Sequence, residues 1–258
     1  MGPDRDRKRD RSGRRLFLDE IPSEGEEILL EGPRRHYISD VLRMRKGDPL
    51  ILFDGSGWQY QAVLAGVTRR QVHIRVGGRL TGQTESPIRV LLGIGVLKAH
   101  KMDLVIQKAS ELGVAEVYPI AVSRAVPLLT LEERSNARRG RWQKIAQEAS
   151  RQSGRIHVTE VKPVTAFAEI LSKAREVDLS LLFTQAMSIA LSEVAKDVEA
   201  SPARILLLVG PEGGFSPAEE GRAIQNGFTP VGLGPRTLRA ETAAILAVGL
   251  VQHRFGDL

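Results

Sequence analysis

Two glycine-bearing loops in the second half of the sequence carry residues that could bind a polar ligand and act on it. The first is LLLVGPEGGFSPAEE, residues 206–220, which begins as an apolar run typical of a buried strand. Gly210, Gly213 and Gly214 permit backbone angles and close approaches that a Cβ forbids, and Pro211 stiffens the turn. The loop is therefore a candidate ligand site.

A helix is predicted directly after this loop, because Ser216 can cap the first backbone N–H groups and Pro217 suits the first helical position. A loop between a strand and a helix presents backbone N–H and C=O groups to a flat or polar ligand. The alternative is a tight strand-to-helix turn that binds nothing, which is common for a single glycine-rich loop.

The second loop is VGLGPRTLRAETAA, residues 231–244, where charged residues stand between a short strand-like run and an apolar helix. The charged and polar members are Arg236, Arg239, Glu241 and Thr242. Core packing explains such a cluster poorly, although solvated caps and ion pairs are an alternative. Neither loop has the dinucleotide, P-loop or nucleophile-elbow pattern, so a Rossmann hydride enzyme, a P-loop NTPase and a serine hydrolase lose support.

Metal and thiol chemistry are not expected. The chain has no Cys, and no two of its five His residues have the spacing of a local metal pair. A mechanism that needs a cysteine nucleophile, such as covalent activation of a pyrimidine at C5, is thereby excluded. The sequence predicts an enzyme without a metal.

The elements that must position the loops fall into two sets. From 14 to 80, short alternating segments separated by Gly, Pro and Asp predict a small β-barrel, with one helix that ends at Gly47. The turn-rich stretch 81–87 is the predicted linker. From 88 to 258, continuous apolar runs alternate with helical stretches, which predicts an α/β domain whose parallel sheet is covered on both faces.

The charge balance favours a polyanionic partner. The net charge is +6 and the isoelectric point is about 9.8, and Lys and Arg release counterions when they neutralise phosphates. Residues 1–13 form a predicted disordered basic arm, which could contact nucleic acid or be a solvated tail. No apolar run is long enough to span a membrane and no secretory signal is evident, so we expect a soluble, cytoplasmic protein.

The stretches LLLVGPEGGFS and LGPRTLRAETAAI together resemble the signature of the SPOUT methyltransferases. More narrowly, the chain resembles the RsmE family from Arg14 onward, through HYISDVLRMRKGD, ILFDGSG, MDLVIQKASELGV and RWQKIAQEASRQSGR. This resemblance implies a PUA-like RNA-binding barrel, a trefoil-knotted α/β domain, a homodimer and the cofactor S-adenosylmethionine. It also implies methylation of N3 of a specific uridine in 16S ribosomal RNA, within an assembled or assembling small subunit.

The resemblance also implies which residues form the site. The cofactor should contact the two loops through Gly210, Pro211, Glu212, Gly213, Leu233, Gly234, Arg236, Leu238, Thr242 and Ala243. A third loop is expected at Phe183, Thr184 and Gln185.

Methylation of a uridine nitrogen requires stabilisation of the uracil anion, so Arg239 and Arg155 are the catalytic candidates, with Glu241 or Glu212 as general base or orienting carboxylate. For Arg155 a structural ion pair is the alternative. Flanking phosphates are expected at Arg14, Arg15, Arg43 and Arg45, for which a solvated barrel surface is the alternative. Two other functions remain open: a SPOUT-type ribose 2′-O or transfer-RNA methyltransferase, and an inactive RNA-binding assembly factor.

Overall fold

A computed structural model describes residues 14–81, 84–125, 132–186, 188–196, 198 and 201–258. The chain divides into two compact units. The small unit contains residues 1–84 and 151–157, and the large unit contains residues 85–150 and 158–258. The predicted basic arm, residues 1–13, lies outside the described residues, as do residues 82–83 of the predicted linker.

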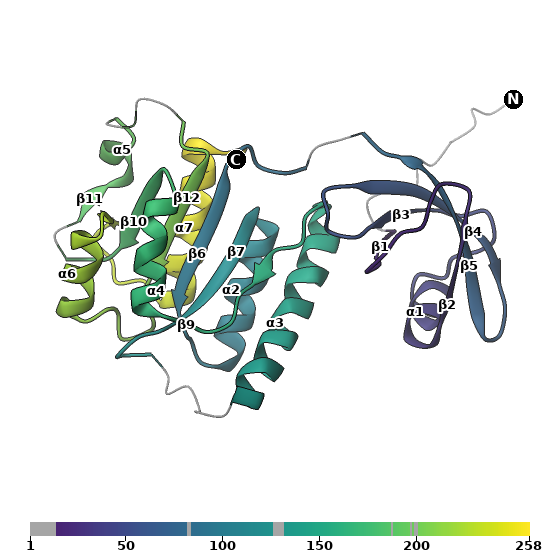
Figure 1. The fold of residues 1–258 in the computed structure, drawn as a ribbon, viewed down its shortest axis with the longest axis horizontal. Helices are drawn as coiled ribbons and strands as arrows, with labels where there is room; N and C mark the ends of the chain where they lie inside the picture. The colour runs from purple at the N-terminus through teal and green to yellow at the C-terminus, as the bar shows by residue number, and fades with distance from the viewer. Residues whose placement is uncertain (1–13, 82–83, 126–131, 187, 197, 199–200) are drawn as a thin grey trace, which may run out of the picture. The chain divides into compact units, whose positions relative to one another are not determined.

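The small unit is built on a five-stranded sheet in the order β1-β3-β4-β5-β2 (Figure 1). β1 and β3 are parallel and the other neighbours are antiparallel. On β4 the buried Ala62 and Leu64 alternate with the exposed Val63, which confirms the period-two pattern of a half-buried sheet. The elements are β1 (Arg15–Phe17), β2 (Glu27–Glu31), α1 (Gly32–His36), the π-helical η2 (Tyr37–Val41), β3 (Pro49–Phe53), β4 (Gln59–Val67) and β5 (Gln71–Arg79).

The predicted helix of the small unit ends earlier than expected. The helical residues stop at Val41 rather than at Gly47, because Arg43 adopts a positive φ of 50°, in the left-handed region that ends a helix. Arg43 and Arg45 therefore lie in the connection to β3 and not in the last turn of a helix.

The large unit is an eight-stranded sheet in the order β11-β13-β10-β12-β6-β7-β8, with β9 paired to β7, and each of its described strand pairs is parallel. The strands are β6 (Arg89–Gly95), β7 (Val114–Ala121), β8 (Glu160–Val161), β9 (Thr165–Ala166), β10 (Leu179–Phe183), β11 (Ile189–Ala190), β12 (Arg204–Val209) and β13 (Thr229–Gly232). The helices are α2 (Ala99–Glu111), α3 (Glu132–Ser153), α4 (Phe167–Ser172), η3 (Lys173–Glu176), α5 (Leu191–Val194), α6 (Pro217–Gln225) and α7 (Ala240–Phe255).

Helices cover both faces of this sheet, as predicted (Figure 1). On the central strand β12, Ile205, Leu207 and Val209 pack into the core that includes α2 and α7. Leu206 and Leu208 point to the opposite face, into the core that includes α4 and α6. A strand buried on both faces reads as a continuous apolar run, which is why RILLLV was recognisable in the sequence.

The segment 151–157 is the main departure from the predicted organisation. It lies within the stretch 88–258 that was predicted to form the α/β domain, but it packs in the small unit. There Arg15 donates to the backbone oxygen of Arg155 at 2.7 Å, and Ser56 forms a β-bridge with His157. Contacts between residues more than 100 positions apart leave no local periodic pattern, so the sequence did not indicate them. No helix among the described residues is long and apolar enough to cross a membrane.

Candidate functional site

A cavity of about 360 Å³ opens at the carboxyl ends of β10, β12 and β13, where ligands of parallel sheets normally bind. The loops after these three strands supply most of its lining. The lining residues that the sequence also predicted for a cofactor are Gly210, Pro211, Glu212, Gly213, Leu233, Gly234, Arg236, Leu238, Ala243, Phe183, Thr184 and Gln185. Thr242 is exposed and is not among the lining residues.

The loop after β12 is a tight turn that only glycine permits. Gly214 has a φ of 67° and donates its N–H to the oxygen of Pro211 at 2.9 Å. A Cβ on Gly210 would lie 3.0 Å from the Cα of Gly214, closer than ordinary van der Waals contact. At Gly210, Gly213 and Gly214 the turn therefore lines the cavity with backbone and no side chain.

Glu219 holds this loop to the end of β7. The predicted N-cap is confirmed: Ser216 caps α6 in a capping box with Glu219. The Glu219 carboxylate accepts hydrogen bonds from the backbone N–H of Ser216 at 2.7 Å and from the backbone N–H of Ser123 at 2.8 Å. Burial alone would raise the pKa of Glu219, but these hydrogen bonds outweigh it and lower the pKa.

Arg124 is a second anchor that the sequence analysis missed. Its guanidinium donates to the backbone oxygens of Gly213 at 3.1 Å and Phe215 at 3.2 Å, and it lines the cavity. Its position in the sequence could have indicated this role, because Ser123 and Arg124 follow shortly after β7, at the same sheet edge as the glycine loops.

The loop after β13 leads into α7. Gly234 has a φ of 91°, and Arg239 is the N-cap residue of α7 with its backbone oxygen accepting from the N–H of Ala243 at 2.8 Å. Arg239 is exposed, and Glu241 lies in the first turn of the helix. Arg236 lines the cavity, whereas Arg239 and Glu241 are not among its lining residues.

Lys101 joins the two predicted carboxylates. Its ammonium lies 3.2 Å from a carboxylate oxygen of Glu212 and 3.7 Å from one of Glu241, so one cation from α2 bridges the β12 loop and α7. Burial alone would raise the pKa of Glu212, but hydrogen bonds from its own backbone N–H and from Lys101 lower it. The sequence analysis did not assign Lys101 to the site.

The third loop continues from β10. The hydroxyl of Thr184 donates to Glu220 at 2.6 Å, and the side-chain amide of Gln185 donates to the Thr237 hydroxyl at 3.2 Å. These bonds link the loop to α6 and to the loop before α7, so the three loops form one connected rim.

The five remaining predicted arginines all belong to the small unit. Arg14 pairs with Asp48 at 3.0 Å. Arg15 and Arg155 are each only 4% exposed, and Arg15 donates to Gln59 and stacks over Phe53, so burial leaves these two little surface for a ligand. Arg43 and Arg45 are exposed.

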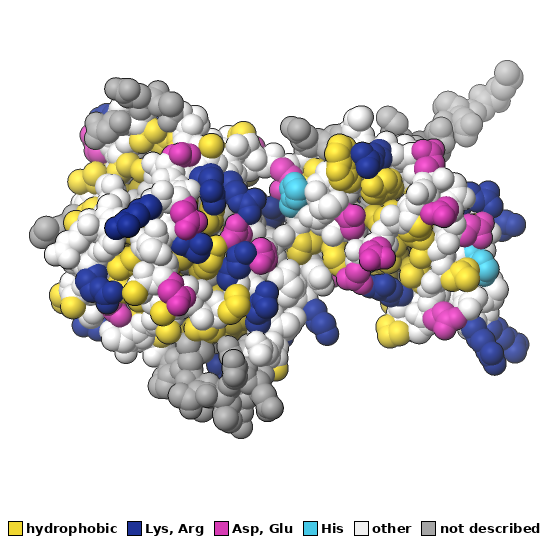
Figure 2. Space-filling view, viewed as in Figure 1, with side chains coloured by type: hydrophobic (Ala, Val, Ile, Leu, Met, Phe, Trp, Pro, Cys, Tyr) yellow, Lys and Arg dark blue, Asp and Glu magenta, His cyan; other side chains and the backbone are white. Residues whose placement is uncertain are grey.

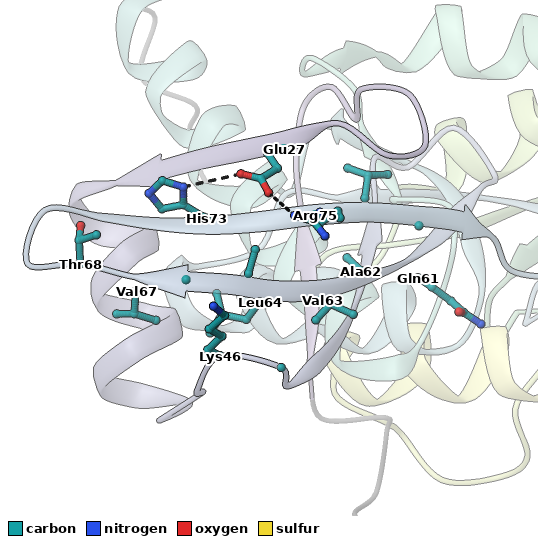
Figure 3. Close-up of a pocket in the computed structure, with 15 residues that line it drawn as sticks. Glu27, Lys46, Gln61, Ala62, Val63, Leu64, Val67, Thr68, His73 and Arg75 are labelled. Carbon is teal, nitrogen blue, oxygen red and sulfur yellow. Dashed lines mark hydrogen bonds and ion pairs between the residues drawn. The ribbon is translucent and has the colours of Figure 1, made fainter.

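A larger cavity, about 690 Å³, lies along β4 and β5 of the small unit (Figure 3). In it Glu27 stands between two basic groups, 2.9 Å from Arg75 and 3.8 Å from His73, and the hydrogen bond from Arg75 lowers the pKa of Glu27. Because Glu27 offsets the positive charge, and none of the predicted site residues lines it, this cavity is a weaker candidate than the one in the large unit.

Charge alone does not single out a site. On the face of the large unit seen in Figure 2, Lys and Arg side chains alternate with Asp and Glu side chains. Within the described ranges, no three His, Asp or Glu side chains gather closely enough to hold a metal ion. The glycine-lined cavity is therefore the candidate site because of its geometry.

Comparisons with known proteins show which family the chain belongs to. Residues 84–252 match the family model of the RNA methyltransferase domain, and residues 30–77 match that of the RNA methyltransferase PUA domain. The fold and the site thus define a two-domain RNA methyltransferase. Ribosomal RNA small subunit methyltransferase E of Bacillus subtilis is 31% identical over 93% of this chain and 96% of its own length. The chain belongs to the ribosomal RNA small subunit methyltransferase E family.

Two further relatives support the assignment. The protein of the same name from Synechocystis is 32% identical and covers 87% of this chain and 72% of its own length. The crystal structure of ribosomal RNA small subunit methyltransferase E from Neisseria gonorrhoeae, bound to S-adenosyl methionine, superimposes with a TM-score of 0.85 at 31% identity. The match covers 95% of this chain and 99% of that one.

Proposed function

We propose that this protein transfers a methyl group from S-adenosylmethionine to N3 of a uridine in 16S ribosomal RNA of the small subunit, in the cytoplasm. One observation carries the proposal: a glycine-lined cavity at the carboxyl ends of β10, β12 and β13 in a chain of this family. The relative from Neisseria gonorrhoeae, which is bound to S-adenosyl methionine, supports the choice of cofactor.

The cavity fits such a cofactor. Gly214 and Gly234 line it, both have positive φ, and nothing lies within 4 Å of where their Cβ atoms would be. Side chains at these positions would fill space that the backbone leaves open for a ligand. Backbone groups of the β12 and β13 loops would bind the cofactor, and Leu233 and Leu238 would contact its apolar parts. When bound, the cofactor supplies a methyl group on a positively charged sulfur.

The chain's own task is to position and stabilise the uracil. N3 of uridine carries a weakly acidic proton, so cations near the uracil oxygens would stabilise the anion that attacks the methyl group. Arg236 lines the cavity and Arg239 is exposed three residues later, and we assign the uracil contact to Arg239. We assign Glu241, which is paired with Lys101, to orientation of this loop.

The proposal also includes how the chain contacts its RNA substrate and that two copies of the chain form a homodimer. Because N3 lies on the Watson–Crick edge, the target uridine must be unpaired or flipped. Arg43 and Arg45 are exposed on the PUA unit and are available for flanking phosphates. Leu246 is 39% exposed on α7, beside the partly buried Ile245 and Leu250. This apolar strip is suited to a homodimer interface, and we place the trefoil knot of the SPOUT superfamily at that interface.

The test is methylation of unmodified small ribosomal subunits with labelled cofactor, followed by mass spectrometry of the nucleosides. We expect N3-methyluridine. Ribose methylation or a product only on transfer RNA would indicate the alternative targets, and cofactor binding without any product would indicate an inactive assembly factor.

The assignment of Arg239 has its own test. Arg239→Ala should lower the single-turnover rate by about 100- to 1,000-fold, as loss of one donor to a developing anion typically does, while calorimetric affinity for the cofactor changes little. Arg175→Ala is the matched control, because Arg175 is an exposed arginine of the same unit on η3. Equal rates for the two variants would refute the catalytic role of Arg239.

A further inference from the structure

The small unit exposes a large aromatic side chain in a position that the proposed function does not use. Trp58 lies in the connection between β3 and β4 and is 49% exposed, whereas Trp142 of the large unit is 5% exposed. A single exposed apolar residue needs no explanation by itself. The residues around Trp58, however, suggest a reason for its exposure.

The loop that presents Trp58 is held by several independent contacts. Gly55 and Gly57 have positive φ values of 82° and 101°, and the N–H of Ser56 donates to the Asp54 carboxylate at 2.9 Å. A Cβ on Gly57 would lie 2.6 Å from the ring of His157, so only glycine allows this close approach. The indole is therefore presented from a preorganised turn.

A guanidinium lies directly over the indole. The Arg79 Cζ is 4.3 Å from the centre of the Trp58 ring and 5.8 Å from that of Tyr60, its register partner across β4 and β5. A guanidinium is planar, so one face can stack on an aromatic ring while the other stays available for a second flat group.

Next to this stack is a cavity of about 580 Å³ that is lined by Tyr60 and Arg79. The cavity also contains Glu24, which is exposed, and the side chain-free Gly77. The site thus combines an aromatic ring, a planar cation and a hydrogen-bond acceptor around one open space.

We propose that this site binds an unpaired nucleobase of the RNA, stacked on Arg79 and Tyr60 and supported by Trp58. Proteins that recognise single-stranded RNA stack bases on aromatic rings and on guanidinium planes, and the cation favours a ligand whose backbone is anionic. A carboxylate only accepts hydrogen bonds, so Glu24 favours a base whose edge carries N–H donors. The proposal rests on the proposed function for the identity of the RNA, and it names a flanking nucleotide rather than the methylated one.

Tryptophan fluorescence of the full chain tests this directly, because the other indole, Trp142, is buried. The probes are single-stranded RNAs of about ten nucleotides, oligocytidylate and oligouridylate, with polyphosphate as a purely electrostatic competitor. We expect saturable quenching by single-stranded RNA that is absent in Trp58→Phe and is not produced by polyphosphate. Quenching of equal size by polyphosphate would overturn the proposal, because charge alone would then explain it.

Binding of end-labelled RNA, measured by anisotropy, gives the energetic test. Trp58→Ala and Arg79→Ala should each weaken binding by about tenfold, and Trp58→Phe, which keeps a ring, should recover most of the loss. Val63→Ala is the control, since Val63 is 44% exposed on β4, the strand that also carries Tyr60, but does not line this cavity. Thermal unfolding of each variant identifies any that fails to fold, in which case Trp58→Phe and the quenching experiment decide.

These experiments distinguish a failure of the nucleobase site from a failure of the proposed function. If Trp58→Ala and Val63→Ala bind RNA equally well and both methylate small subunits, the nucleobase site is wrong and the methyltransferase assignment is intact. If the unmodified protein binds RNA with quenching of Trp58 but methylates no subunit, the proposed function fails and the nucleobase site stands.

Discussion

Replacement of Glu219 by alanine should destabilise the large unit and disorganise the cofactor loop together. Its carboxylate accepts from the backbone N–H groups of Ser216 and Ser123 and from both of their hydroxyls, at 2.7–3.1 Å. Glu219→Ala keeps the cap bond from the backbone N–H of residue 219 to the Ser216 hydroxyl but removes the bonds to the carboxylate, and a hydrogen bond to a charged group contributes roughly 1.5–3 kcal/mol. Because Glu219 is 9% exposed, water replaces these bonds incompletely, and we expect a loss of about 3 kcal/mol.

Differential scanning calorimetry measures this loss. For a chain of this size about 3 kcal/mol corresponds to a fall in Tm of roughly 6–12 °C. Glu193→Ala is the control, because Glu193 forms an exposed ion pair with Lys196 that contributes at most about 1 kcal/mol. The affinity for S-adenosylmethionine should fall in Glu219→Ala and not in the control. Equal Tm values for the two variants would show that the capping box does not hold the loop.

Four further outcomes are expected. Burial alone would raise the pKa of Glu116, but hydrogen bonds from Tyr118 and Arg89 and the charge of Lys162 outweigh burial and lower the pKa to about 2. The ionised Glu116 therefore stabilises the fold fully above about pH 4.5, and this stabilisation is lost as the pH falls toward 2. Glu116→Gln should therefore flatten the dependence of Tm on pH between these limits, as thermal unfolding in a pH series will show. Ala243→Phe should fill the cavity and weaken cofactor binding in calorimetry by about tenfold or more without loss of helix content. Leu246→Glu should convert a dimer to monomers in sedimentation, and an unchanged sedimentation coefficient would exclude this face of α7 from the interface. Chelator should leave methyl transfer unchanged, because the candidate cavity offers backbone, Arg and Glu groups rather than a cluster of metal ligands.

The parts of the fold that the sequence predicted are those with local patterns. The alternation on β4 and the continuous apolar run of β12 identified a half-buried and a fully buried strand, and Ser216 with Pro217 marked the start of α6. The helix in the small unit was overestimated because the sequence around Arg43 continues to favour a helix, while the structure places that residue at positive φ.

The site was predictable to the extent that glycine marks it. The two glycine loops line the cavity, but Lys101 and Arg124 come from elements whose sequences carry no such mark. Each reaches the site through a contact between residues about 90 or more positions apart, to Glu212 and Gly213 respectively. Such contacts are set by the order of strands in the sheet, which a single sequence does not encode in any local pattern.

The geometry also distinguishes between two roles for the carboxylate at the cavity. Glu212 lines it, and the hydrogen bonds from its own N–H and from Lys101 lower its pKa below the ordinary value. A general base works best when its pKa is near the operating pH, so Glu212 is poorly suited to remove the N3 proton. It is better suited to hold Lys101, which also pairs with Glu241 at the start of α7 and so fixes the loop that carries Arg239. In our proposal the N3 proton leaves to solvent and the rate depends on how well cations stabilise the uracil anion, so we expect the catalytic effect from the arginines of the β13–α7 loop rather than from Glu212.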